Sequence, residues 1–92
     1  MEKRIGTVSV LISNREIVPK VNQILSEFGN LILARQGLPL HERGLHFISL
    51  IMEATTDELS AMTGRLGRLP DVEVKSILAK SKFSNHNNQN LE

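Results

Sequence analysis

The chain has 92 residues, of which 40% are hydrophobic, and its 11 basic and 10 acidic side chains give a formal net charge of +1. This length fits one small domain and excludes a second core or a separate DNA-binding module. The balanced charge argues against direct binding of a nucleic acid by bulk electrostatics. Because there is no cysteine, a disulfide framework, an iron–sulfur cluster and a thiol redox site are excluded.

No part of the sequence approaches the roughly 20 consecutive apolar residues that cross a bilayer. The amino-terminal residues 1–4 run directly into the first predicted strand and do not form a targeting segment. The sequence therefore predicts a cytoplasmic protein with no membrane partner.

Alternating apolar and polar side chains predict a first strand over Ile5–Ser13, with Val8, Val10 and Ile12 on one face. A single apolar stripe at helical spacing predicts a first helix within Asn14–Gly29. The apolar face of the strand is expected to meet this helix.

Pro19 lies close to the start of this helix, and a proline has no amide hydrogen to donate beyond the first helical turn. The helix is therefore expected to begin within a few residues upstream of Pro19 or with an irregular turn. Asn14 is a suitable amino-terminal cap, and Gly29 follows the helix. A second strand is predicted over Leu31–Arg35.

The third strand is predicted over Leu45–Glu53 and the fourth over Asp71–Ala79. Between them, Thr55–Gly67 is predicted to form the second helix. Thr55 and Glu58 have the spacing of a capping box, in which each side chain covers the backbone amide of the other residue.

These elements form two strand–helix–strand units within a single predicted domain over residues 1–80. They predict an α+β, ferredoxin-like βαββαβ sandwich, with a four-stranded antiparallel sheet and two helices on one face. The remaining residues, 81–92, are polar and low in complexity and are predicted to be disordered. The last two, Leu91 and Glu92, are interpreted as a cloning remnant.

The third strand is apolar on both faces, whereas one layer of helices covers only one side of a sheet. We therefore expect the uncovered side to pack against another copy of the chain, giving a homo-oligomer, either a dimer or a tetramer. The alternative is that these residues are ordinary exposed apolar side chains. The predicted interface residues are Leu11, Leu45, Phe47, Ile51 and Ile77.

The connection Arg35–Gly44 carries two arginines, a proline and glycines at both ends. If Arg35 and Arg43 converge across this hairpin, their guanidinium groups would bind the carboxylate or phosphate of a small anionic metabolite. The alternative is that Arg43 pairs with an acidic side chain and that the connection only builds the oligomer. The candidate ligand-binding residues, which include the turn after the first strand, are Arg35, Gly37, His41, Arg43, Asn14 and Arg15.

The three histidines do not have the spacing of a metal site. His46 shares the parity of Ile48 and Leu50, which favours a half-buried structural role. The acidic residues are dispersed, and no nucleophile, histidine and acid follow one another in a recognisable catalytic motif. Without tyrosine or tryptophan, the uncovered sheet also lacks the aromatic platforms of an RNA binder. No catalytic residue, metal or cofactor is expected.

The stretches Asn14–Val21 and Ile24–Gly29 resemble the start of the ligand-binding ACT domain, in which a turn after the first strand leads into a helix closed by glycine. ACT domains commonly have a glycine in that turn, where this chain has Ile17. A closer resemblance covers residues 4–79 and relates the chain to the ACT-like family of iron-only hydrogenase system regulators. It rests on Arg35–Pro39, Glu42–Gly44, Phe47–Leu50 and Gly64–Val72.

This resemblance implies a ferredoxin-like regulatory or sensory domain associated with an iron-only hydrogenase system, related to the carboxy-terminal domain of nickel-responsive repressors. The histidines and cysteine that bind nickel in those repressors have no counterpart here, so nickel sensing is not implied. We expect regulation through oligomerisation, with a small ligand at the subunit contacts. The alternatives are a small acylphosphatase-like enzyme and a metal-binding sensor of the same fold.

Overall fold

The computed structural model describes residues 2–80. Its main elements are β1 Arg4–Ile12, α1 Val18–Glu27, β2 Ile32–Leu40, β3 Leu45–Ala54, α2 Thr56–Gly67 and β4 Val72–Leu78. Short 3-10 turns lie before α1 and on either side of β2, namely η1 Arg15–Ile17, η2 Gly29–Leu31 and η3 His41–Arg43. The polar segment 81–92, predicted to be disordered and to end in a cloning remnant, lies outside the described residues.

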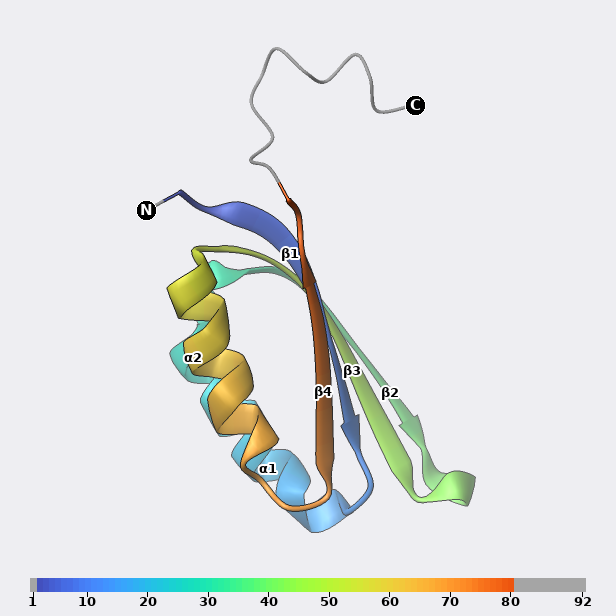
Figure 1. The fold of residues 1–92 in the computed structure, drawn as a ribbon. Coiled ribbons are helices and arrows are strands. Elements are labelled where there is room, and N and C mark those ends of the chain that lie inside the picture. Colours follow the sequence, from blue (N-terminus) through green and yellow to red (C-terminus); the bar gives the residue numbers. More distant parts are fainter. Residues whose placement is uncertain (1, 81–92) are drawn as a thin grey trace, which may run out of the picture.

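The four strands form one antiparallel sheet in the order β2-β3-β1-β4. Figure 1 shows both helices on the same side of this sheet, roughly along the strands. The predicted βαββαβ ferredoxin-like fold is therefore confirmed. Neither helix in residues 2–80 combines the length and the apolar character that spanning a membrane requires.

The hydrophobic core lies between the sheet and the two helices. Alternate residues of β1 and β3 point toward the helices, and Val10, Leu50 and Met62 are completely buried there. Because side chains alternate along a strand, the intervening residues point to the other side. The buried apolar residues are Val8, Val10, Ile12, Val21, Ile24, Leu25, Leu31, Ile48, Leu50, Met52, Ala54, Leu59, Met62 and Leu66.

The predicted irregular start of the first helix is confirmed. The turn η1 precedes α1, and Pro19 occupies one of the first two positions of α1, where its missing N–H group disrupts no helical hydrogen bond. The Asn14 side chain caps η1 by accepting a hydrogen bond from the backbone N–H of Glu16.

The predicted connection Arg35–Gly44 is wrong in extent, because β2 continues to Leu40 and only His41–Gly44 form the turn. Glycine and proline are common in turns, but Gly37 and Pro39 lie within β2 and pair with β3. Proline is tolerated there because β2 is an edge strand. Gly44 does need its conformational freedom, since its φ of 67° is in the left-handed region.

The capping box predicted at the start of the second helix is present. Its contribution to the stability of the fold can be measured by substitution. Thr55 Oγ1 accepts from the Glu58 N–H (3.1 Å), and Glu58 Oε1 accepts from the Thr55 N–H (2.9 Å). We expect Thr55→Ala to lower the free energy of unfolding by about 1 kcal/mol in urea denaturation. Thr56→Ala, at the exposed first residue of α2, should change it by less than about 0.5 kcal/mol. Equal effects of the two substitutions would contradict a specific capping role.

The same box makes a pH-dependent contribution. Donation from the Thr55 backbone N–H, together with Lys3 at 3.7 Å, lowers the pKa of Glu58 below its ordinary 4.5. Stabilisation by this carboxylate is therefore complete above that value and is lost as the pH falls through the lowered pKa. We expect the urea midpoint to fall more steeply between about pH 5 and pH 3 in the wild type than in Glu58→Gln, whose amide accepts the bond without titrating. Parallel pH profiles would show that Glu58 contributes no such stability.

Candidate functional site

The side of the sheet opposite the helices, which we call the open face, carries two rows of mainly apolar side chains separated by a polar row. The strand register defines these rows, because paired residues on neighbouring strands point to the same side. In the order β2, β3, β1, β4 they are Leu38, Phe47, Leu11, Glu73; then Gln36, Ser49, Ser9, Lys75; then Ala34, Ile51, Thr7, Ile77.

Four large apolar side chains of the open face are substantially exposed, namely Phe47 at 37%, Ile51 at 44%, Leu38 at 55% and Ile77 at 74%, whereas Leu11 is half-buried. Leu11, Phe47, Ile51 and Ile77 of the predicted interface lie on this face. Leu45, the fifth predicted residue, is half-buried near the hairpin turn. Leu45 pairs with Leu40 and shares the parity of Phe47, so it belongs to the end of the same side of the sheet, and the role of the five residues in assembly stays a prediction.

The structure does not bring the two arginines of the predicted ligand site together. Arg35 donates a hydrogen bond to Asn22 Oδ1 on α1, and it pairs with Leu50 in the strand register. Arg43 lies in the turn η3, beyond the end of β2 at Leu40. The five residue-to-residue steps from Arg35 to Leu40 alone span about 17 Å of strand. Arg35 also borders a smaller hollow of about 250 Å³ at the β2 edge.

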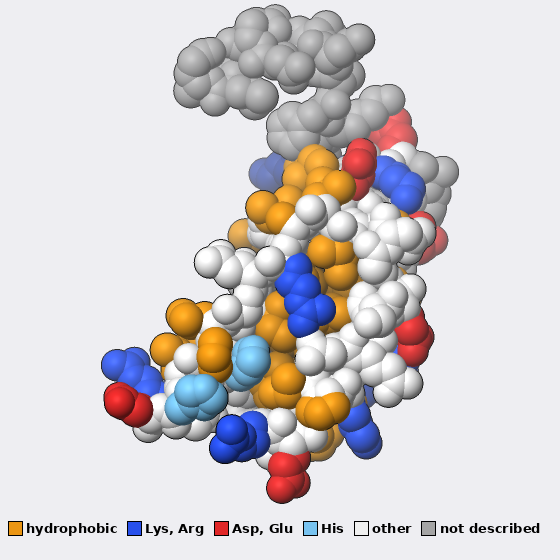
Figure 2. Space-filling model, turned by 180° about the vertical axis from the view of Figure 1, so that it is seen from behind, with side chains coloured by type: hydrophobic (Ala, Val, Ile, Leu, Met, Phe, Trp, Pro, Cys, Tyr) orange, Lys and Arg blue, Asp and Glu red, His pale blue; other side chains and the backbone are white. Residues whose placement is uncertain are grey.

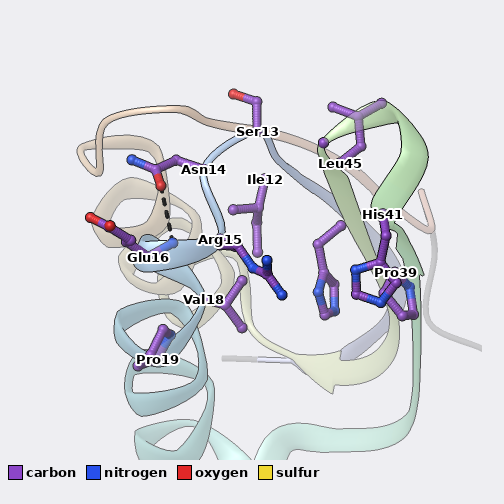
Figure 3. A pocket seen from close by; sticks show the side chains of 12 residues that line it. Ile12, Ser13, Asn14, Arg15, Glu16, Val18, Pro19, Pro39, His41 and Leu45 are labelled. Atoms are coloured by element: carbon purple, nitrogen blue, oxygen red, sulfur yellow. Dashed lines mark hydrogen bonds between the residues drawn. The ribbon is translucent and has the colours of Figure 1, made fainter.

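A larger pocket of about 760 Å³, which we call the hairpin pocket, lies between the turn after β1 and the β2–β3 hairpin. In Figure 3 the side chains of Arg15 and His41 point from these two walls into the same space. Of the candidate ligand residues, Asn14, Arg15 and His41 line this pocket, whereas Arg35, Gly37 and Arg43 do not. The lining residues are Ile12, Ser13, Asn14, Arg15, Glu16, Val18, Pro19, Pro39, His41, Gly44, Leu45 and His46.

The polar side chains of the hairpin pocket favour a negatively charged ligand. The Arg15 side chain makes no hydrogen bond or ion pair with any residue in 2–80. Glu16 is the single acidic residue of the lining, and Figure 3 shows its carboxylate directed away from the Arg15 guanidinium. The guanidinium is thus free to bind a carboxylate or a phosphate.

Three backbone amides of the turn after β1 donate hydrogen bonds within the protein. The Ser13 N–H donates to the Asp71 carbonyl (2.9 Å), and the Ile17 N–H donates to the Asn14 carbonyl (2.9 Å). The Glu16 N–H is taken by the Asn14 side chain at 3.0 Å. These three amides are therefore not available to an anion at this turn.

His46 contributes to the pocket in a way that sequence reasoning missed. It is half-buried on the helix side of β3, as its parity predicted, and the register places it between Ile12 and Pro39, which also line the pocket. Its imidazole lies against β2, because a Cβ built on Gly37 would be 3.6 Å from His46 Nε2. Sequence reasoning lacked the strand register, which places His46 beside Ile12 and Pro39.

Figure 2 shows the two histidines of the described chain next to each other on the surface, with basic side chains nearby. Residues 2–80 contain no group of three or more His, Cys, Asp or Glu side chains positioned to hold a metal ion. His41 and His46 both line the hairpin pocket, where a neutral imidazole can donate a hydrogen bond from one ring nitrogen.

Comparisons with known proteins place this fold in context. The family model TM1266-like, described as "Iron-only hydrogenase system regulator, putative", matches residues 4–76. The solved structure of the uncharacterized protein TM1266 from Thermotoga maritima is 32% identical with a TM-score of 0.83, over 86% of this chain and 100% of that one. An unknown protein from Galdieria sulphuraria has the same fold at 20% identity and a TM-score of 0.59, over 90% of this chain and 48% of that one.

No curated protein matched the chain. The family model covers most of the sequence, and the resemblance stated from the residues alone is confirmed. The chain therefore belongs to the TM1266-like family of iron-only hydrogenase system regulators.

Proposed function

We propose that this chain is a regulatory domain that acts as a homo-oligomer assembled through its open face and responds to a small anionic ligand. The single observation that carries this proposal is the pair of mainly apolar rows on the open face. Membership of the family connects the domain with an iron-only hydrogenase system, and the mechanism is inferred from the surface of this chain.

The support for self-association is the clustering of exposed apolar side chains. Leu38, Phe47 and Leu11 are consecutive across three strands, and Ile51 lies in the other apolar row. Contiguous apolar patches on small proteins mark interaction sites more often than isolated apolar residues do. We propose a second copy as the occupant because a twofold axis would cover the open faces of both copies at once, with the same rows on each side of the contact.

The ligand is proposed to act from the hairpin pocket, because the same two strands carry the pocket and part of the open face. Pro39 and His46 line the pocket, whereas their neighbours Leu38 and Phe47 lie in an open-face row. A bound ligand would favour one subunit arrangement over another only if it bound the two arrangements with different affinities.

The acylphosphatase-like alternative receives less support. Such an enzyme uses a glycine-bearing anion loop after the first strand. Here Ser13, Asn14 and Arg15 include no glycine, and the amides of Ser13, Glu16 and Ile17 in this turn donate within the protein. The metal-sensor alternative would need ligands beyond His41 and His46, and residues 2–80 offer no group of three.

Self-association is tested by sedimentation velocity over a concentration series around tens of micromolar. We expect the wild type to form a dimer or tetramer. Phe47→Gln and Ile51→Gln should weaken the association constant by at least about tenfold, since each removes a large apolar side chain from the buried surface. Both side chains are partly exposed in the single chain, so circular dichroism should show an unchanged fold.

Leu33→Gln is the matched control, because Leu33 is 59% exposed but lies at the β2 irregularity, outside the three rows. We expect it to leave the association constant near that of the wild type. A monomeric wild type would overturn the proposal. So would strong disruption by Leu33→Gln with none by the two open-face substitutions, because that result would assign assembly to the β2 edge.

A further inference from the structure

We infer that the hairpin pocket is a binding site for a small phosphate monoester with an apolar body, bound by Arg15, His41 and His46. This inference deepens the proposed function, on which it rests, by naming the chemical class and the site of the regulatory ligand.

The donors of the pocket come from three separate elements. Arg15 belongs to η1, His41 to η3 and His46 to β3. Arg15 approaches the pocket from the turn after β1, whereas His41 and His46 approach it from the hairpin, and the side chains of Arg15 and His41 can be followed in Figure 3. None of the three side chains has a hydrogen-bond or ion-pair partner within residues 2–80. Their hydrogen-bonding groups are thus available to a ligand.

The number and the spread of these donors favour phosphate over carboxylate. A carboxylate has two oxygens in one plane, and a single bidentate arginine satisfies both. A phosphate monoester has three terminal oxygens directed to different sides, so it can accept from a guanidinium and from two imidazoles at once. Arginine paired with additional donors is a common way for proteins to bind phosphate.

The apolar residues that line the rest of the pocket favour a phosphate that carries an organic group. Pocket residues without charge or a polar side chain include Val18 and Pro19 on one side, and Pro39 and Leu45 on the other. The volume of about 760 Å³ is much larger than a bare phosphate ion and is in the range of pockets for small organic ligands. An aromatic or aliphatic ester group fits these walls.

The positive charge of the site comes from its side chains, and three amides of the turn after β1, those of Ser13, Glu16 and Ile17, already donate to Asp71 or Asn14. If backbone amides bound the phosphate, the loss of one arginine would lower the affinity less than if side chains bound it. Replacing Arg15 should therefore have a large effect on affinity, and this distinguishes a built site from general attraction to positive charge.

Phenyl phosphate is the probe, because it combines the anion with a flat apolar body. Its binding to ¹⁵N-labelled protein is followed by amide chemical-shift titration, with inorganic phosphate, benzoate and phenol as comparison ligands. We expect saturable binding of phenyl phosphate, with shifts concentrated in residues 12–19 and 39–46. Inorganic phosphate and benzoate should each bind at least about fivefold more weakly, and phenol should not bind measurably.

Arg15→Gln should weaken phenyl phosphate binding by about tenfold or more, as expected for the loss of charge-assisted hydrogen bonds. His46→Gln should weaken it by a smaller factor. Arg43→Gln is the matched control, because Arg43 is an exposed arginine of the same hairpin that does not line the pocket. It should change the affinity by less than about twofold.

Equal losses in Arg15→Gln and Arg43→Gln would overturn the inference, because they would indicate general electrostatic attraction. Benzoate binding tighter than phenyl phosphate would overturn the assignment to phosphate, and shifts outside the pocket would overturn the site. Sedimentation of the unliganded protein separates this inference from the proposed function. If the chain associates through the open face but does not bind phenyl phosphate, the ligand assignment fails while the proposal of self-association survives.

Discussion

The structure depends on one constraint, which is that two helices cover a single face of a four-stranded sheet. Burial of Val10, Leu50 and Met62 between these layers provides the main stabilisation of the fold. Because strand side chains alternate, every residue that is not directed to the helices is directed to the open face. The open face is therefore a geometric result of the same pattern that builds the core, and its apolar rows are additional to what folding requires.

Most of the correct sequence-based predictions rest on the alternation of side chains along the strands and on the capping residues at the helix ends. Alternation in the first and third strands identified the core side of each strand, and the Thr55 capping box located the start of the second helix within one residue. These features were predictable because they depend on neighbours within a few residues. The open-face positions of Phe47 and Ile51 followed from the same alternation.

The extent of the second strand was not predictable by the same reasoning. Gly37 and Pro39 are typical of turns, and only the sheet order shows that β2 lies at an edge where proline is tolerated. Sequence reasoning therefore placed Arg35 and Arg43 in one loop, whereas they lie far apart along the hairpin. The pocket was missed as a unit because it joins the turn after β1 to a hairpin that begins some twenty residues later. Arg15 and His46 become neighbours only through the strand register.

In this small domain, a single layer of helices leaves both a pocket and an open sheet face at the surface. The pocket forms where the hairpin and the turn after β1 leave a space between them, at one end of the core. The turn uses its own amides for local hydrogen bonds, which makes its conformation defined without a ligand. Arg15 is thus presented by a preformed turn, and binding of the proposed ligand would require little ordering of the backbone.

The alternation of pocket and open-face residues along β2 and β3 also limits how this protein can change in evolution. His46 and Phe47 are adjacent in the chain but serve opposite surfaces, as do Pro39 and Leu38. A one-residue insertion or deletion within either strand would exchange the two sets and damage both surfaces together. If the proposed ligand site and assembly surface are both used, point substitutions would change one without the other, whereas insertions and deletions would be tolerated mainly in the turn at His41–Gly44.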